Sequence, residues 1–328
     1  MTVTILGGGI SGLSCAINLG KAGIRNVVYE KEKAIGSKHD YHISAIRNYD
    51  LKKDAIEELR DFGVSLKPSN SVKKVYRLSP NFCSVLYSEK PVFYLFKRGS
   101  ARDSIESQLF SQLTKNTEVY LGFNGKLSPD VIASGAKRAD VFGFGYVFKG
   151  LNMENAVYIF YDNRYAPGGY VCVLPSGKEG FVLSVIFKKE YFKRAKSLLN
   201  SAILENRVLS GMTDGAERLN VFSCYSSLNS NRKKTICIGE AGGFQDASKG
   251  FGIRYAIISG CLAAKSIIEG KDFSRLCEFL RKEFKENKKF RMFANRATND
   301  DYDRMVKGLG KEVSLDSYLE KREKYRND

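Results

Sequence analysis

The sequence has few of the residues and patterns that mark metal-binding, disulfide-bonded or membrane-spanning proteins. It contains two histidines, His39 and His42, with no metal-ligand spacing, so we expect no metal site. Seven cysteines are scattered without a C-x-x-C pair, as expected for reduced thiols in a cytoplasmic protein. The most apolar long stretch, 250–268, contains Arg254 and Lys265, which favours a buried helix over a membrane span.

Signals for export and for repeated architecture are also missing. No basic segment precedes the apolar N-terminal residues, and glycines interrupt them, so they do not resemble a signal peptide.

The charge of the chain, in contrast, is unbalanced: 53 Lys and Arg against 36 Asp and Glu give a net charge of +17. That excess favours an anionic partner such as a membrane surface or a phosphorylated substrate, but a generally lysine-rich composition explains it equally well. No arginine-rich stripe is present, and we expect no nucleic acid partner.

The N-terminal residues carry the clearest motif of the chain. An apolar run, 2–6, leads into Gly7-Gly8-Gly9-Ile10-Ser11-Gly12, and a helical pattern and a second apolar run ending on Glu30 follow. Strand, G-x-G-x-x-G, helix, strand and acid is the dinucleotide-binding fingerprint in its required order. The alternative is a glycine-rich turn in another α/β protein.

Each part of this motif has a physical role. Gly7 permits the tight turn, Gly9 lets the backbone approach a pyrophosphate, and Gly12 lets the helix pack closely on the strand. The helix N-terminus presents N–H groups to the phosphates, and an acid at the end of the second strand accepts hydrogen bonds from ribose hydroxyls. The predicted contacts to the nucleotide in this half are Gly7, Gly9, Ile10, Ser11, Gly12, Glu30 and Lys31.

The chain is long enough for two domains, and α/β segments alternate along it with β-rich segments. We therefore predict an α/β protein with an α+β substrate part: a Rossmann-type domain, an inserted antiparallel-sheet domain and a C-terminal helical segment. Residues 33–50 lack periodicity and are expected to form an ordered loop. The predicted pieces are 1–65, 97–150 and 225–272 for nucleotide binding, 66–96 and 151–224 for the substrate sheet, and 273–328 for the C-terminal segment.

Three further segments carry a second pattern. Arg98 precedes a predicted helix, Ala133-Ser134-Gly135 ends a buried strand, and a glycine-rich region contains Gly239-Glu240 and Gly250-Phe251-Gly252-Ile253. With these segments the chain resembles the FAD-dependent oxidoreductases of the geranylgeranyl reductase group, in the p-hydroxybenzoate hydroxylase-like superfamily. The resemblance spans most of residues 1–270 and implies FAD as the tightly bound nucleotide.

The resemblance also implies roles for individual residues. Gly239-Glu240 is similar to the second FAD motif, usually Gly-Asp, whose acid contacts the ribityl or pyrophosphate region. Gly250 to Ile253 is similar to the turn whose backbone approaches the isoalloxazine ring, where helix N–H groups face developing negative charge. The FAD contacts implied by the second pattern are Arg98, Ser134, Gly135, Gly239, Glu240, Gly250, Gly252 and Ile253.

The substrate half departs from the family pattern. Geranylgeranyl reductases carry Tyr-x-Trp-x-Phe-Pro, and here Tyr170 to Pro175 has Cys172 at the Trp position and Leu174 at the Phe position. By this alignment Tyr170 and Cys172 are the candidate proton donors. An imidazole of His39 or His42 is a further candidate acid near neutral pH, and a structural loop role is the alternative for both histidines.

Together these patterns predict an FAD-dependent enzyme that reduces C=C bonds of an isoprenoid or lipid-like substrate, in the cytoplasm or at a membrane surface. Alternatives are a flavin monooxygenase of an aromatic substrate, and a non-catalytic FAD protein that docks on a membrane. No second G-x-G-x-x-G is present, so the expected electron donor is a ferredoxin, a reduced deazaflavin or transiently bound NAD(P)H.

Overall fold

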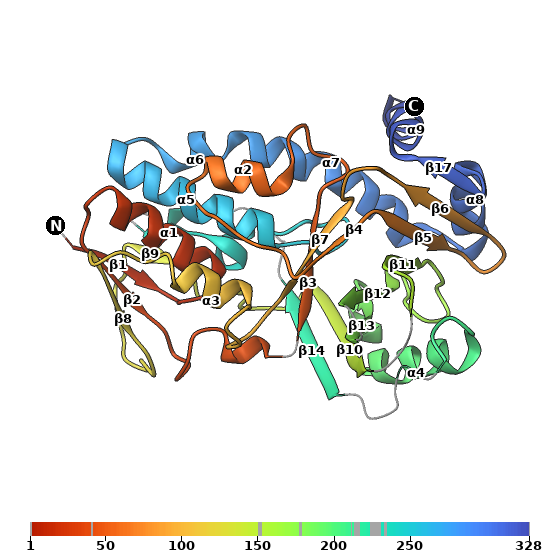
Figure 1. Ribbon diagram of the computed structural model, residues 1–328, viewed down its shortest axis with the longest axis horizontal. Coiled ribbons are helices and arrows are strands. Elements are labelled where there is room, and N and C mark those ends of the chain that lie inside the picture. Colours follow the sequence, from red (N-terminus) through yellow and green to blue (C-terminus); the bar gives the residue numbers. More distant parts are fainter. Residues whose placement is uncertain are drawn as a thin grey trace.

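The computed structural model describes residues 2–40, 42–149, 153–176, 179–210, 212, 217–223, 231–232 and 235–327. Three sheets organise these residues, and the smallest lies between the two larger ones (Figure 1). The predicted boundaries at residues 150–151 and 224–225 lie outside the described residues. The predicted α/β class, with a Rossmann-type parallel sheet and a second, mainly antiparallel sheet, is confirmed.

The first large sheet has the strand order β15-β16-β9-β1-β2-β8, and every pairing except β15–β16 is parallel. Its strands are β1 (Val3–Leu6), β2 (Asn26–Tyr29), β8 (Thr117–Tyr120), β9 (Val131–Ile132), β15 (Asn231–Arg232) and β16 (Thr235–Cys237). Helix α1 (Ile10–Lys21) connects β1 to β2 and packs along α5 (Ile253–Glu269). A Cβ on Gly260 would lie 2.3 Å from the Ser11 carbonyl oxygen, so glycine there permits the close approach of the two helices.

The second large sheet has the order β14-β10-β13-β12-β11-β5-β6-β17. Its strands are β5 (Lys74–Leu78), β6 (Cys83–Tyr87), β10 (Val141–Lys149), β11 (Ala156–Phe160), β12 (Tyr170–Ser176), β13 (Glu179–Ile186), β14 (Glu217–Ser223) and β17 (Glu312–Ser314). Helix α4 (Ala195–Glu205), preceded by the 3-10 turn η2 (Lys189–Arg194), covers one face of this sheet. The opposite face looks toward the nucleotide half of the molecule and carries the apolar side chains of the site.

The third sheet joins β3 (Ile43–Arg47), β7 (Phe93–Lys97) and β4 (Asn70–Val72), in the order β3-β7-β4 and all antiparallel. The prediction of a loop over residues 33–50 was therefore wrong, because β3 and the 3-10 turn η1 (Ser37–His39) lie within it. Strand β3 gains its hydrogen bonds from β7, about fifty residues away, so its own sequence gives little periodic signal.

The remaining helices cover the parallel sheet and continue toward the C-terminus, where α9 ends the chain at the opposite end of the molecule from residue 2 (Figure 1). They are α2 (Ala55–Asp61), α3 (Ile105–Phe110), α6 (Phe273–Leu276), α7 (Glu278–Arg296), α8 (Asn299–Leu309) and α9 (Leu315–Asn327). The C-terminal segment is helical as predicted, except that β17 pairs with β6. Among the described residues, every helix is too short or too polar to cross a membrane.

Candidate functional site

One cavity of about 820 Å³ runs from the glycine loop after β1 to the apolar face of the large antiparallel sheet. This size lies within the range of pockets that hold cofactors and drug-sized ligands. Residues from every predicted cofactor segment line it, and so do Tyr170 and Cys172 from β12. The structure thus brings together side chains that lie more than two hundred residues apart in the sequence.

The glycine loop between β1 and α1 has the space that a diphosphate requires. Gly7 has a φ of 110°, and a Cβ there would lie 2.4 Å from the Ala133 carbonyl oxygen. A Cβ on Gly12 would lie 2.0 Å from the Gly7 carbonyl oxygen, so Gly12 is needed for packing and does not line the cavity. A Cβ on Gly9 would meet nothing within 4 Å and would project into open space. The loop therefore fits a nucleotide phosphate at Gly9.

The acid at the end of β2 is held by the backbone around it. Glu30 Oε2 accepts a hydrogen bond from Gly8 N at 2.6 Å, and Oε1 accepts one from Glu32 N at 2.9 Å. This arrangement fixes the carboxylate beside the glycine loop, where a ribose would meet it. Lys31 also lines the cavity but is exposed, and its Nζ lies 3.3 Å from Glu32 Oε1.

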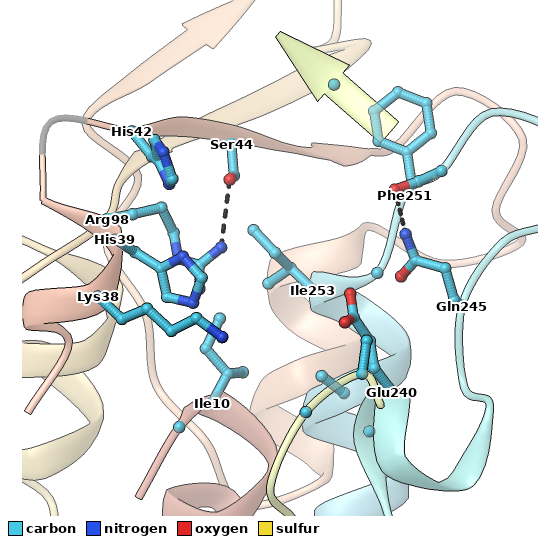
Figure 2. A pocket seen from close by; sticks show the side chains of 18 of the residues that line it. Ile10, Lys38, His39, His42, Ser44, Arg98, Glu240, Gln245, Phe251 and Ile253 are labelled. Carbon is cyan, nitrogen blue, oxygen red and sulfur yellow. Dashed lines mark hydrogen bonds between the residues drawn. The ribbon is translucent and has the colours of Figure 1, made fainter. Parts of the chain in front are cut away.

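A second glycine-rich turn brings helix α5 to the same cavity. Gly239, which begins the 3-10 turn η3 (Gly239–Gly242), and Gly250 both have positive φ, and Gly252 immediately precedes α5. A Cβ on Gly252 would lie 1.9 Å from Gln245 Oε1, so a larger residue there would displace the Gln245 side chain. The first residues of α1 and α5, Ile10 and Ile253, both point into the site (Figure 2).

Neither helix start is capped by a side chain, and neither has an acid in its first turn. Two helix N-termini therefore direct their positive dipole ends at one cavity, which suits an anionic cofactor such as a flavin nucleotide. Glu240 lies on the cavity wall near Gln245 (Figure 2). Sequence reasoning missed Gln245, whose Nε2 donates a hydrogen bond to the Gly250 carbonyl oxygen; its position inside the second glycine-rich segment was the available signal.

The opposite wall is basic and comes from the η1 loop and β7. Arg98 Nε donates to Glu106 Oε1 at 2.6 Å, and its Nη1 donates to Ser44 Oγ at 3.3 Å. Glu106 is buried, with 1% exposure, so it fixes the guanidinium at the cavity wall beside His39 and His42 (Figure 2). Ser134 and Gly135, which follow β9, line the cavity as well, and Gly135 has a φ of 77°.

The two histidines are neutral in this environment. Burial, reinforced by the positive charge of Arg98, lowers the pKa of His39 to about 2 and that of His42 to about 4. These pKa values disfavour the hypothesis that one of them supplies a proton as an imidazolium near pH 7. His42 instead packs against the Phe181 ring, with 6.0 Å between ring centroids.

Alternate residues of neighbouring strands form the apolar floor of the cavity, because side chains two apart share one face of a sheet. The floor residues are Val141 and Gly143 of β10, Val157 and Ile159 of β11, Tyr161 beyond it, Tyr170, Cys172 and Leu174 of β12, and Phe181, Leu183 and Val185 of β13. Tyr170 and Cys172 both lie on this face and line the cavity.

The hydroxyl of Tyr170 and the thiol of Cys172 are both protonated at neutral pH. Burial raises the pKa of Cys172 to about 12 and the pKa of Tyr170 well above its usual value. The Tyr170 hydroxyl donates a hydrogen bond to the Lys249 carbonyl oxygen, so its proton is already engaged. Cys172 is a free thiol on the cavity floor.

The fold and the site together define a Rossmann-type nucleotide-binding protein with a second, mainly antiparallel sheet. Residues 5–51 match the family described as NAD(P)-binding Rossmann-like domain. No curated protein matches the sequence.

Solved structures match over almost the whole chain. A geranylgeranyl bacteriochlorophyll reductase-like protein from Thermoplasma acidophilum is 18% identical with a TM-score of 0.75, covering 96% of this chain and 93% of that one. A flavin-dependent brominase is 17% identical with a TM-score of 0.66, covering 93% and 90%. The p-nitrophenol 4-monooxygenase of Pseudomonas putida is 16% identical with a TM-score of 0.61, covering 94% and 95%.

The chain therefore has an NAD(P)-binding Rossmann-like domain and the fold of geranylgeranyl reductase-like proteins and other flavin-dependent enzymes.

Proposed function

We propose that this protein is an FAD-dependent oxidoreductase that reduces C=C bonds of an isoprenoid or lipid-like substrate. The observation that carries the proposal is the single cavity, which joins a nucleotide-type glycine loop to an apolar sheet face. When bound, the flavin would supply the hydride, since that chemistry belongs to the cofactor. The protein's own contribution is to bind and orient the flavin and the substrate, and to exclude water from the cavity.

Specific residues fit these tasks. With FAD bound, the space at Gly9 would accept the diphosphate and Glu30 would hold the ribose, while the uncapped start of α5 would stabilise negative charge on the reduced flavin. The apolar floor on β10 to β13 excludes water from an apolar substrate. A reduced double bond also needs a proton, and Cys172 is the favoured donor because the Tyr170 proton is engaged with Lys249.

The visible spectrum of the purified protein tests the cofactor. We expect the absorption bands of oxidised flavin, their bleaching by dithionite without oxygen, and their return when an isoprenoid alkene is added. Return of the bands with no alkene acceptor, together with oxygen uptake in the presence of NAD(P)H and an aromatic compound, would instead indicate a monooxygenase. Supplying NAD(P)H, ferredoxin or reduced deazaflavin in parallel identifies the electron donor.

The proton donor is tested by Cys172→Ala, which we expect to lower the rate of alkene reduction by about 100-fold, a typical contribution of general acid catalysis. Flavin content and the rate of flavin reduction are expected to stay unchanged, because the thiol lies on the substrate side of the cavity. Cys83→Ala, at an exposed free cysteine outside the cavity, is the matched control. A larger loss in Tyr170→Phe than in Cys172→Ala would assign the role to Tyr170.

A further inference from the structure

Helix α7 runs along one edge of the molecule (Figure 1). Its inner side, which includes Leu280 and Phe284, is buried in the core beneath it. Residues three or four apart lie on the same side of a helix, and one such stripe of α7 is exposed along its whole length. The residues of this outer stripe are Lys282, Lys285, Lys289, Met292 and Arg296.

The positive charges of the outer face are mostly uncommitted. Lys282 Nζ lies 3.8 Å from Glu278 Oε1, whereas the other exposed lysines and the exposed arginine of α7 form no ion pair within the described part of the chain. With Lys288 beside the stripe, five exposed cations of α7 outnumber its two exposed carboxylates, Glu278 and Glu286. This face therefore has a net positive charge that no described carboxylate neutralises.

Large apolar side chains interrupt the basic face near the C-terminal end of the helix. Met292 is 60% exposed and the adjacent Phe293 is 42% exposed. The ring centroid of Phe293 lies 6.1 Å from that of the half-buried Phe290, so the exposed apolar surface is continuous with a packed aromatic pair. Adjacent exposed apolar side chains rimmed by charges are typical of surfaces that contact a partner.

This part of α7 also lies against the end of the cavity. Lys249 lines the cavity, and its Nζ lies 5.5 Å from the centroid of the Phe290 ring. Arg291, buried on the inner side of the helix, donates hydrogen bonds to the carbonyl oxygens of Gly168 and Ser248. The basic and apolar outer face is therefore attached rigidly to the segments around the cavity.

We propose that the outer face of α7 docks on an anionic membrane surface. The lysines contact the lipid headgroups, and Met292 and Phe293 enter the boundary between headgroups and acyl chains. Charge complementarity favours this partner, and so does shape: a single helix is convex, and a deformable bilayer covers it without the matching groove that a protein partner needs. The inference goes beyond the proposed function, because docking requires no chemistry at the flavin.

Vesicle flotation of the purified full-length protein tests the charge. We expect it to bind vesicles of equal parts phosphatidylcholine and phosphatidylglycerol at least about tenfold more strongly than vesicles of phosphatidylcholine alone, and to lose this preference as salt is raised. The triple variant Lys285→Gln, Lys288→Gln, Lys289→Gln is expected to bind the anionic vesicles at least about tenfold more weakly.

A second triple variant is the matched control, because it removes the same net charge from other parts of the surface. Its changes are Lys73→Gln, Lys115→Gln and Lys126→Gln, all at exposed positions outside α7. We expect it to bind the anionic vesicles as the wild type does.

Fluorescence tests the insertion of the apolar residues. The sequence contains no tryptophan, so Met292→Trp gives a single reporter at the proposed contact. We expect its emission to shift to shorter wavelength with anionic vesicles and to be quenched by brominated acyl chains. Leu204→Trp is the matched control at a position of α4 that is 85% exposed, and its emission is expected to stay unchanged.

Absent or equal binding of the wild type to the two kinds of vesicle, an equal loss in the two triple variants, or equal shifts at positions 292 and 204 would overturn the docking surface. These results are separable from failure of the proposed function. Protein that floats with anionic vesicles but carries no flavin contradicts the oxidoreductase alone. A flavin-loaded alkene reductase that does not bind the vesicles contradicts the docking surface alone.

Discussion

Gly9 and Gly12 lie one turn apart, but their missing side chains have different consequences. Gly9 has extended backbone angles and open space around its Cβ position, so alanine fits there without strain. We expect Gly9→Ala to keep the melting temperature of the flavin-free protein and to weaken FAD binding by at least about tenfold, because the methyl group occupies the phosphate space. Flavin titration followed by absorbance measures the effect.

Gly12→Ala is the matched variant. Its Cβ would lie 2.0 Å from the Gly7 carbonyl oxygen, so helix α1 must move away from β1. The expected cost is about 1–3 kcal/mol in the free energy of unfolding, measured in urea without flavin. A loss of stability in Gly9→Ala would contradict the role of Gly9 in leaving space for the phosphate. An unchanged stability in Gly12→Ala would contradict the role of Gly12 in the packing of α1.

His42 makes the stability of the protein depend on pH. Its pKa is about 4 in the folded protein and about 6.5 when exposed, so between these values the unfolded chain binds more protons. Above pH 6.5 His42 is neutral in both states and the free energy of unfolding has its full value. As the pH falls from 6.5 toward 4, protonation of the unfolded chain lowers the free energy of unfolding by on the order of 3 kcal/mol. We expect His42→Gln to flatten the slope of unfolding free energy over this range. A steeper slope in the variant would contradict the assignment.

Individual residues of the site differed in how well the sequence predicted them. The glycines and Glu30 lie in one short motif with fixed spacing, so their geometry follows from local order. Lys249, in contrast, acquires its position from a contact with Tyr49, 200 residues away in the chain. No local pattern reveals a contact of that kind.

Helices α2, α5 and α7 are joined by one ion-pair network behind the start of α5. Arg254 is 8% exposed; its Nη2 lies 2.6 Å from Glu58 Oε1, and its Nη1 lies 2.9 Å from Glu283 Oε2. Arg254→Gln leaves two carboxylates without their cation, and we expect it to destabilise the protein by about 3 kcal/mol. Flavin affinity is expected to fall as well, because α5 begins at the cavity.

Urea unfolding of the flavin-free protein measures the first effect and flavin titration the second. Lys265→Gln is the control on the same helix, where an exposed lysine lies 4.0 Å from Glu269 and is expected to contribute less than about 0.5 kcal/mol. If Arg254→Gln were as mild as this control, the network would not hold α5 in place.

Some helices and strands were predicted accurately and others were assigned to the wrong part of the fold. The difference depends on how far along the chain each element lies from the strands with which it pairs. Helix α5 and the unit from β1 to β2 have strong periodicity and were expected close to their observed limits. Strand β10 lies in the piece 97–150 predicted for nucleotide binding, but it pairs with β13 and β14 of the other large sheet. An apolar run indicates a strand without indicating which sheet receives it.

The two large sheets share one ligand cavity, so a ligand there stabilises both. We expect saturating FAD, at about 100 times its dissociation constant, to add about 2.7 kcal/mol and to raise the melting temperature by about 5 °C. Removing the flavin should lower the melting temperature by the same amount in one calorimetric scan. NAD⁺ serves as the control and is expected to give no shift; an equal shift with NAD⁺ would contradict the selection of FAD.

The general arrangement of the molecule was predictable because α/β and β-rich segments alternate along the sequence, and a Rossmann-type unit beside an antiparallel sheet follows from that order. The small sheet between them, in which β3, β4 and β7 lie side by side (Figure 1), was not predicted. Its three short strands are widely spaced in the chain, so no local pattern indicates that they pair.

Strand β17 also constrains the order in which this protein is built during translation. Residues 312–314 pair in parallel with β6, whose residues 83–87 are synthesised long before. Nascent chains leave the ribosome from the N-terminus, and segments fold as their partners become available. Until residues 312–314 have been synthesised, β6 is therefore the open edge of this sheet, on which a chaperone or a second nascent chain can pair.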